Sequence, residues 1–341
     1  MPILLANQVT EVGPDQIRFI AYMGCIVAAM AGGYVARRTG LAKPGWARPV
    51  MSAAIIGCDA PIAGLAVWHL TIREGIWKVP VLGGMVAVAT CLVGLAVARA
   101  RRMPPGDAAV FGLQSGMGNV GYTLGGSLAF ALWGVQGLAV EQMYCLMWPF
   151  FAFLFCFPLA RHYGQRAAGE AAGESGLHYA GRILLRSLTD LRSLPLYTAA
   201  LGLTLNLRAV APPAAIQRWH VLDALMVIGI VAQFGGVGMT VVARRLPVFW
   251  KKAMGTAALK FLVSPALTLV LALAMGLTGM PLEVCLLLAV MPSALYSVLI
   301  ANLFHLNKDL ANATFILTHA VCLSGVAVGA AAWRLGFLPA G

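Results

Sequence analysis

The sequence contains few charged residues for its length. Asp, Glu, Lys and Arg make up only 11% of the 341 residues, whereas they make up about 25% of a soluble domain. Acidic residues are the scarcest, with 12 Asp and Glu against 24 Lys and Arg, so the formal net charge is +12. This scarcity of charge excludes an ordinary soluble protein. The apolar content of 60% and the recurring apolar stretches of about 20 residues predict a protein with many membrane-spanning helices.

The sequence also lacks the motifs of several enzyme and binding classes. The seven cysteines lie in apolar stretches without metal-ligand spacing, so we interpret them as small packing residues. Residues 116–121 match GxGxxG, but no strand precedes them, which excludes a dinucleotide site. No soluble basic cluster is present to bind nucleic acid. We therefore predict no catalytic residue, metal site or cofactor, and an intramembrane enzyme is a remote alternative.

The apolar stretches predict ten membrane spans. They cover roughly residues 17–36, 48–70, 79–99, 107–132, 138–160, 194–210, 221–243, 252–277, 281–304 and 309–333. Most Lys and Arg lie in the loops on one side of these spans. The positive-inside rule places that side in the cytoplasm. We therefore expect a multi-pass protein of the plasma (bacterial inner) membrane, in contact with lipids and with both termini outside the cytoplasm.

An even number of spans with this orientation predicts two inverted five-helix repeats. The first repeat is expected at residues 1–163 and the second at residues 194–341. Residues 164–193 are expected to form a cytoplasmic linker with an amphipathic helix, although that helix could also be an extension of the sixth span. The predicted fold is therefore an all-α polytopic membrane protein.

Two of the predicted spans carry a helix breaker near their middle. Met117-Gly118-Asn119 interrupts the fourth span and Met291-Pro292-Ser293 interrupts the ninth. An interrupted helix leaves backbone groups unpaired, and a pair of such breaks in two halves points to a transporter's substrate site. We predict that helices 4 and 9 are broken and cross, although glycine unwinds a helix less rigidly than proline. The expected substrate-binding residues are Gly118, Asn119, Pro292, Ser293, Tyr296, Ser297 and Gln114.

The side chains at the breaks have two possible roles. Asn119 and Ser293 can orient the carboxylate of a substrate, or each can cap its own broken helix. An anion favours the free N–H groups of a half-helix, and a cation favours its free carbonyl groups. The sequence leaves both roles open.

Ionisable side chains inside a span are costly and are therefore candidates for function. Asp59 could bind a coupling proton or cation, or pair with a neighbouring donor. Lys260 could balance an anionic substrate, or extend its ammonium to the membrane surface. His319 could relay protons or join two helices, and Gln233 is a candidate cavity residue. An acidic residue at the start of a span stabilises the helix N-terminus, so we assign no functional role to residues in such positions. They are Asp107, Glu141, Asp223, Glu283 and Asp309.

The second half of the chain resembles the auxin efflux carrier family. The resemblance is carried by the stretches LPLYTAALGLTLNLRAVAPP and MPSALYSVLIANLFHLNKDLANATFILTHA, and in the first half by Asp59-Ala60-Pro61, Asn119 and Gly134. It implies the inverted-repeat fold of the bile acid:sodium symporters, with helices 1, 2, 6 and 7 as a scaffold and helices 3–5 and 8–10 as a moving unit. It also implies a homodimer formed through the scaffold. Plant members have Pro-Asn where this chain has Gly118-Asn119, and many members have proline where it has Gly126.

These observations together predict a secondary transporter for a small organic anion such as a carboxylate. The predicted direction of transport is efflux. An elevator-type motion is expected, driven by H⁺ or by the membrane potential, because no Walker motif is present. A sodium-coupled symporter of bile-acid-like anions is the alternative. It is less favoured because sodium sites need several acceptor oxygens and few acids lie near the breaks.

Overall fold

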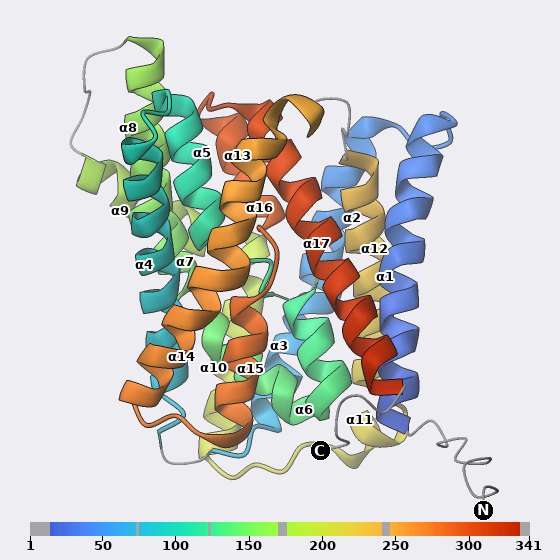
Figure 1. Cartoon of the computed structure of the whole chain (residues 1–341). Helices are drawn as coiled ribbons and strands as arrows, with labels where there is room; N and C mark the ends of the chain where they lie inside the picture. Colours follow the sequence, from blue (N-terminus) through green and yellow to red (C-terminus); the bar gives the residue numbers. More distant parts are fainter. Residues whose placement is uncertain (1–13, 73–74, 122–123, 170–175, 241–245, 335–341) are drawn as a thin grey trace, which may run out of the picture.

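The protein is helical throughout the part that is described. A computed structural model describes residues 14–72, 75–121, 124–169, 176–240 and 246–334, and no β-strand occurs in these ranges. Most helices run roughly parallel to one another, from the top to the bottom of the view in Figure 1. This arrangement is typical of a chain whose apolar helices are long enough to cross a bilayer.

The first half begins with α1 (Pro14–Arg38) and α2 (Ala47–Ala54), and α2 continues through a π-helical turn at Ile55–Asp59 into α3 (Ala60–Trp68). It continues with α4 (Lys78–Ala100), α5 (Pro105–Gly116), α6 (Gly125–Cys145) and α7 (Trp148–Phe150). A π-helical segment at Phe151–Cys156 then leads into α8 (Phe157–Ala168). Pro61 lies at the second position of α3, where its missing N–H breaks no hydrogen bond of α3 itself.

The second half begins with α9 (Gly176–Leu188), α10 (Leu194–Leu207), α11 (Ala214–Arg218) and α12 (Val221–Thr240). A π-helical turn at Leu259–Val263 joins α13 (Leu246–Ala258) to α14 (Ser264–Ala274). The chain then forms α15 (Gly279–Ala289), α16 (Leu295–Leu303) and α17 (Lys308–Arg334). Short 3₁₀ turns at Pro44–Trp46 and Leu191–Ser193 precede α2 and α10.

Seven helical stretches among the described residues are long and apolar enough to cross a membrane. The protein is therefore a multi-pass membrane protein. Each of the expected spans overlaps a helix, but the fourth and ninth are each divided between two shorter helices, α5 with α6 and α15 with α16. Helix α10 has 14 residues, shorter than its expected span.

The segment between the two halves differs in part from the expected linker. Helix α8 continues to Ala168, so residues 164–168 are helical rather than linker, and Gly169 ends the helix in the left-handed conformation with φ of 73°. Such a conformation favours glycine. Helix α9 occupies much of the remaining segment, and residues 170–175 lie outside the described part.

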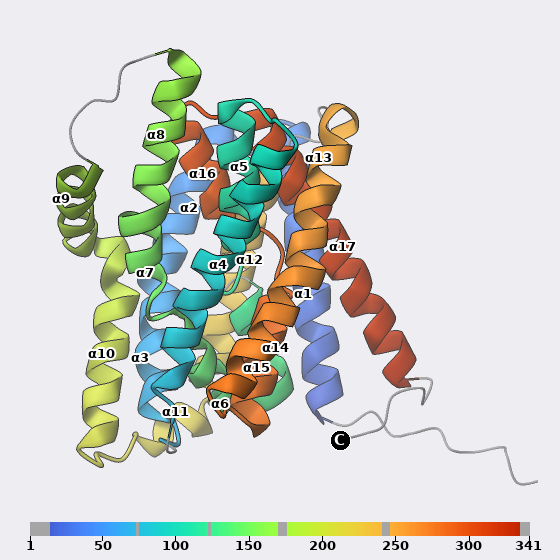
Figure 2. The same ribbon diagram turned by 60° about the vertical axis from the view of Figure 1, so that its left-hand side comes forward.

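The helices pack in two groups that meet at α6. In one group α1 packs against α12, and α3 packs against α10; in the other α4 packs against α5, and α13 packs against α17. Helix α6 contacts α1 and α3 of the first group and α4 and α15 of the second (Figures 1 and 2). A contact that spans the two groups is made by the rings of Tyr22 and Phe130, whose centroids are 6.0 Å apart.

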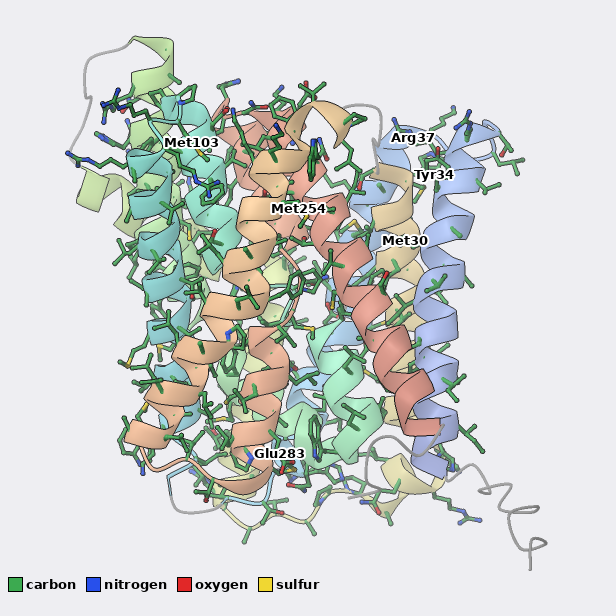
Figure 3. The ribbon with its side chains drawn as sticks, viewed as in Figure 1. Met30, Tyr34, Arg37, Met103, Met254 and Glu283 are labelled. Carbon is green, nitrogen blue, oxygen red and sulfur yellow. The ribbon has the colours of Figure 1, made fainter. Side chains whose placement is uncertain are left out.

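The two ends of the molecule differ in charge. Side-chain nitrogen atoms gather at the end that contains Arg37, whereas Glu283 lies at the opposite end (Figure 3). At the Arg37 end, Asp107 at the start of α5 forms an ion pair with Lys252 of α13 and accepts a hydrogen bond of 2.7 Å from Asn307 Nδ2, just before α17. Asp107 thus stands near a helix N-terminus, as expected, and also joins three helices.

Candidate functional site

The two helix interruptions lie directly against each other. The Asn119 N–H donates a hydrogen bond of 2.7 Å to the Pro292 carbonyl, and the Ala294 N–H donates one of 2.9 Å to the Met117 carbonyl. Gly118 and Ser293 are opposite each other in this short antiparallel bridge. Backbone groups that leave a helix inside a membrane need such partners, so each interruption stabilises the other.

The local sequence accounts for the interruptions. Met117 has extended dihedral angles (φ −86°, ψ 101°) and ends α5, whereas Pro292 has no N–H and disfavours helical geometry in the residue before it. Helices α5 and α16 lie toward one end of the molecule, and α6 and α15 lie toward the other (Figures 1 and 2). The chain therefore passes through the middle twice in non-helical form.

The first N–H groups of α6 are already occupied. The Gly125 N–H donates to the Asn119 carbonyl at 3.1 Å, and the Gly126 N–H donates to the Gly121 carbonyl at 2.9 Å. These two donors of the helix N-terminus are therefore not available to an anion. At this end of α6, side chains are therefore the candidate contacts for a ligand.

Asn119 and His319 form a contact between α17 and the first interruption. Asn119 Nδ2 lies 3.2 Å from His319 Nε2, and His319 Nδ1 lies 2.8 Å from the Phe315 carbonyl. A carbonyl oxygen can only accept a hydrogen bond, so Nδ1 carries the proton and Nε2 of the neutral ring accepts from the Asn119 amide. Protonation of Nε2 would place two donors against each other and would break this contact.

Ser293, Ser297 and Gln114 form a second buried polar group at the crossing. Ser293 Oγ donates to the Gln114 carbonyl at 3.1 Å, and its N–H donates to Thr318 Oγ1 at 3.2 Å. Gln114 Nε2 donates to Ser297 Oγ at 3.2 Å and to the Ala311 carbonyl at 2.9 Å. Gln114 Oε1 has no hydrogen-bond partner in the described part, and a buried acceptor of this kind is unusual.

Tyr296 belongs to a different environment. Its ring packs edge-on against Trp148 with centroids 4.8 Å apart and stacks on Phe157 at 6.1 Å. Gly118 and Pro292 are buried in the crossing itself. The crossing thus brings together most of the substrate-binding residues expected from the sequence, and Tyr296 points into an aromatic cluster.

Lys260 lies beside the first interruption. It is 3% exposed and sits in the π-helical turn between α13 and α14. A Cβ atom added to Gly118 would be 3.1 Å from Lys260 Nζ, so the ammonium lies against the interruption. No described residue forms a hydrogen bond or ion pair with this ammonium. Lys260 instead lines a small, partly open pocket of about 30 Å³ together with Gly118, Ser264 and Tyr144.

Asp59 and Gln233 form a separate pair between α3 and α12. Asp59 is 3% exposed, lies in the π-helical turn before α3, and accepts a hydrogen bond of 2.8 Å from Gln233 Nε2. Neither side chain forms a hydrogen bond to the crossing residues among the described contacts. The two candidates are therefore brought together with each other and not with Asn119.

Several polar residues near the site were not expected from the sequence to have a functional role. Glu141 was expected to stabilise a helix N-terminus at the start of the fifth span, but it is fully buried and accepts hydrogen bonds from Gln142 Nε2 and Cys145 Sγ. That expectation was wrong because the chain kinks at Gly134 (φ 60°, ψ −148°), and Glu141 lies beyond the first turn of the helix that follows this kink. Tyr144, Trp148 and Ser264 were missed because apolar helices commonly carry such residues, and their common pocket depends on tertiary packing.

Comparison with known proteins gives one match. Residues 190–328 match the model of a family described as membrane transport protein. No curated protein matches the chain. The matched region runs from the start of α10 into α17 and includes the second interruption. This match, together with the apolar helices, indicates a membrane transporter.

Proposed function

We propose that the protein is a secondary transporter of a small organic anion such as a carboxylate, and that efflux is its direction. The observation that carries this proposal is the backbone pairing of two interrupted helices, with the Asn119–His319 contact and the Lys260 ammonium beside it. Interrupted helices that meet in mid-membrane are typical of transporter substrate sites.

The sign of the substrate follows from the charges near the crossing. Lys260 is the basic side chain beside the interruption, and no acidic residue is among the hydrogen-bond partners described for Ser293 or Gln114. A buried ammonium without a partner favours a negatively charged ligand. Asn119 would then orient the carboxylate through the amide N–H that His319 otherwise accepts.

The proposed architecture has ten spans in two inverted repeats. In this scheme α5 with α6 and α15 with α16 are the broken helices 4 and 9. The scaffold consists of α1, α2–α3, α10 and α12, and the moving unit consists of the other spans. Close glycine contacts support it, because Gly33 of α1 meets Gly235 of α12 and Gly64 of α3 meets Gly202 of α10. These are equivalent contacts if the two halves are related by a pseudo-two-fold axis.

The proposed motion is of the elevator type, with α6 at the boundary between the two groups. The driving force in this proposal is H⁺ or the membrane potential, and Asp59 with Gln233 is the candidate coupling pair. The alternative is a sodium-coupled symporter of bile-acid-like anions. The proposed location is the plasma (bacterial inner) membrane, with both termini outside the cytoplasm and a homodimer formed through the scaffold helices.

Transport assays in proteoliposomes test the proposal. Counterflow with a panel of labelled carboxylates, with and without sodium and pH gradients, should reveal uptake of at least one anion that needs no sodium. We expect Asn119→Ala to lower this uptake at least tenfold, because the amide is part of the substrate contact.

Asn302→Ala is the matched control, because Asn302 is an exposed amide on α16 that bonds only within its own helix, to the Val298 carbonyl. It should transport like the wild type. Uptake by Asn119→Ala equal to that of the control would contradict the substrate role of the crossing, and uptake that depends on sodium would favour the alternative.

A further inference from the structure

A pocket lies next to the crossing and within one group of helices. Its walls come from α4, the end of α5 and the interruption after it, the end of α6, α7, the π-helical segments Phe151–Cys156 and Leu259–Val263, α14 and α15. No residue of α1, α2, α3, α10 or α12 lines it. A ligand in this pocket would therefore stay with one group of helices and would not lie between the two groups.

The polar side chains that line this pocket are hydrogen-bond donors. Lys260 and Ser264 line it from adjacent turns, and Tyr144 and Trp148 line it from α6 and α7. The ammonium, the two hydroxyls and the indole N–H form no hydrogen bond with any described residue. Lys260 is 3% exposed and Ser264 is 4% exposed. Among the described residues, no aspartate or glutamate lines the pocket.

This combination of groups is suited to an anion. A buried ammonium without a counter-charge is costly, and a bound anion removes that cost. Hydroxyl and indole groups complete the coordination of an anion, because each can donate a hydrogen bond. A cation at the same place would face the ammonium directly, so the pocket selects against it.

We propose that this pocket binds a monovalent anion, held by Lys260, Ser264, Tyr144 and Trp148. The anion is either an inorganic ion of the chloride class or a small carboxylate, which share the same donor requirement. The site lies beside the first interruption and shares Lys260 with the proposed substrate site, so this inference rests on the proposed function and adds to it. The Lys260 ammonium also lies against Gly118. An anion in the pocket therefore neutralises the positive charge beside the first interruption and stabilises the backbone there.

Anion-dependent stability of the purified full-length protein tests this site. Thermal unfolding is measured in detergent at constant ionic strength while sodium gluconate is replaced by sodium chloride, and in a second series by sodium acetate. We expect the unfolding midpoint to rise with a saturable dependence on one of these anions. Saturation by chloride identifies an inorganic ion, and saturation by acetate alone identifies a carboxylate.

Variants locate the effect in the pocket. Lys260→Met should abolish the saturable rise, whereas Lys251→Met, an exposed lysine of α13, should retain it. Ser264→Ala keeps the charge and should raise the anion concentration needed for half-saturation severalfold, so the test remains valid if Lys260→Met does not fold. Saturable quenching of tryptophan fluorescence by iodide should be lost in Trp148→Phe.

Two results would overturn the proposal. One is a wild-type protein whose unfolding midpoint and fluorescence do not respond to chloride, iodide or acetate. The other is a response that Ser264→Ala, Trp148→Phe and Lys260→Met leave unchanged. Because these experiments measure binding and not uptake, either result leaves the proposed transport function to be judged by the proteoliposome assay alone.

Discussion

Gly118 contacts two parts of the site, Ser293 of the second interruption and the Lys260 ammonium. Its backbone pairs with Ser293 across the crossing, and its missing side chain leaves space for the Lys260 ammonium. A proline at this position would also end a helix, but its ring would occupy the space in which the ammonium lies. The glycine therefore fits a chain that carries a lysine beside the interruption.

Gly118→Ala should lower transport without unfolding the protein. The added Cβ would lie 3.1 Å from both Lys260 Nζ and Val120 Cγ1, so the lysine must move. We expect uptake in proteoliposomes to fall about tenfold, which corresponds to roughly 1.4 kcal/mol of lost transition-state stabilisation. Gly121→Ala is the control, because a Cβ at Gly121 meets no atom within 4 Å. Equal uptake by the two variants would show that the space beside Gly118 is unimportant.

At the scale of helices, close packing of glycines holds the first group together. A Cβ on Gly33 would overlap the backbone of Gly235, and a Cβ on Gly202 would overlap the backbone of Gly64. Small residues let helix backbones approach closely, and this packing is a main source of helix association in membranes. The contact between α1 and α12 should therefore tolerate no side chain at Gly33.

Gly33→Ala should destabilise the protein by about 1–3 kcal/mol, the usual cost of overpacking. The neighbouring Gly32→Ala is the matched control, since a Cβ there meets nothing within 4 Å, and alanine favours a helix by up to about 1 kcal/mol over glycine. Thermal unfolding in detergent measures both. The prediction fails if the midpoint of Gly33→Ala is not lower than that of Gly32→Ala.

At the scale of the whole molecule, the distribution of charge predicts the orientation in the membrane. Helix α11 and the beginning of α13 lie at opposite ends of the molecule (Figures 1 and 2). The positive-inside rule assigns the end with Arg37 and Lys251 to the cytoplasm. The loop that contains α11 should then face outward.

Thiol labelling of intact cells checks this orientation. Gln217→Cys on α11 should react with a membrane-impermeant thiol reagent, and Lys251→Cys should react only after permeabilisation; both positions are exposed. The background should be low because the seven native cysteines are buried or half-buried. Labelling of Lys251→Cys in intact cells without labelling of Gln217→Cys would reverse the proposed topology.

Much of the helical arrangement could be predicted from the sequence, because apolar length is a local property. The expected spans overlap helices, and the interruptions fall where Gly118 and Pro292 predict them. The site could be predicted only in part. Asn119 and Ser293 follow from the breaks, but the partners His319 and Gln114 could not be deduced, because they lie on other helices. Glu141 was misjudged because it lies inside the helix that follows the kink at Gly134 and not at the N-terminus of that helix.

The sequence by itself determined that this is a helical membrane protein, and it predicted helix ends near Gly118 and Pro292. Both follow from composition and from the backbone chemistry of glycine and proline, which act on the residues nearest to them. Only the tertiary structure decided which polar groups meet. It set Lys260 against Gly118, paired Asn119 with His319, and gathered Tyr144, Trp148 and Ser264 around one pocket. The reason is that such contacts join residues far apart in the chain, and helix packing alone brings them together.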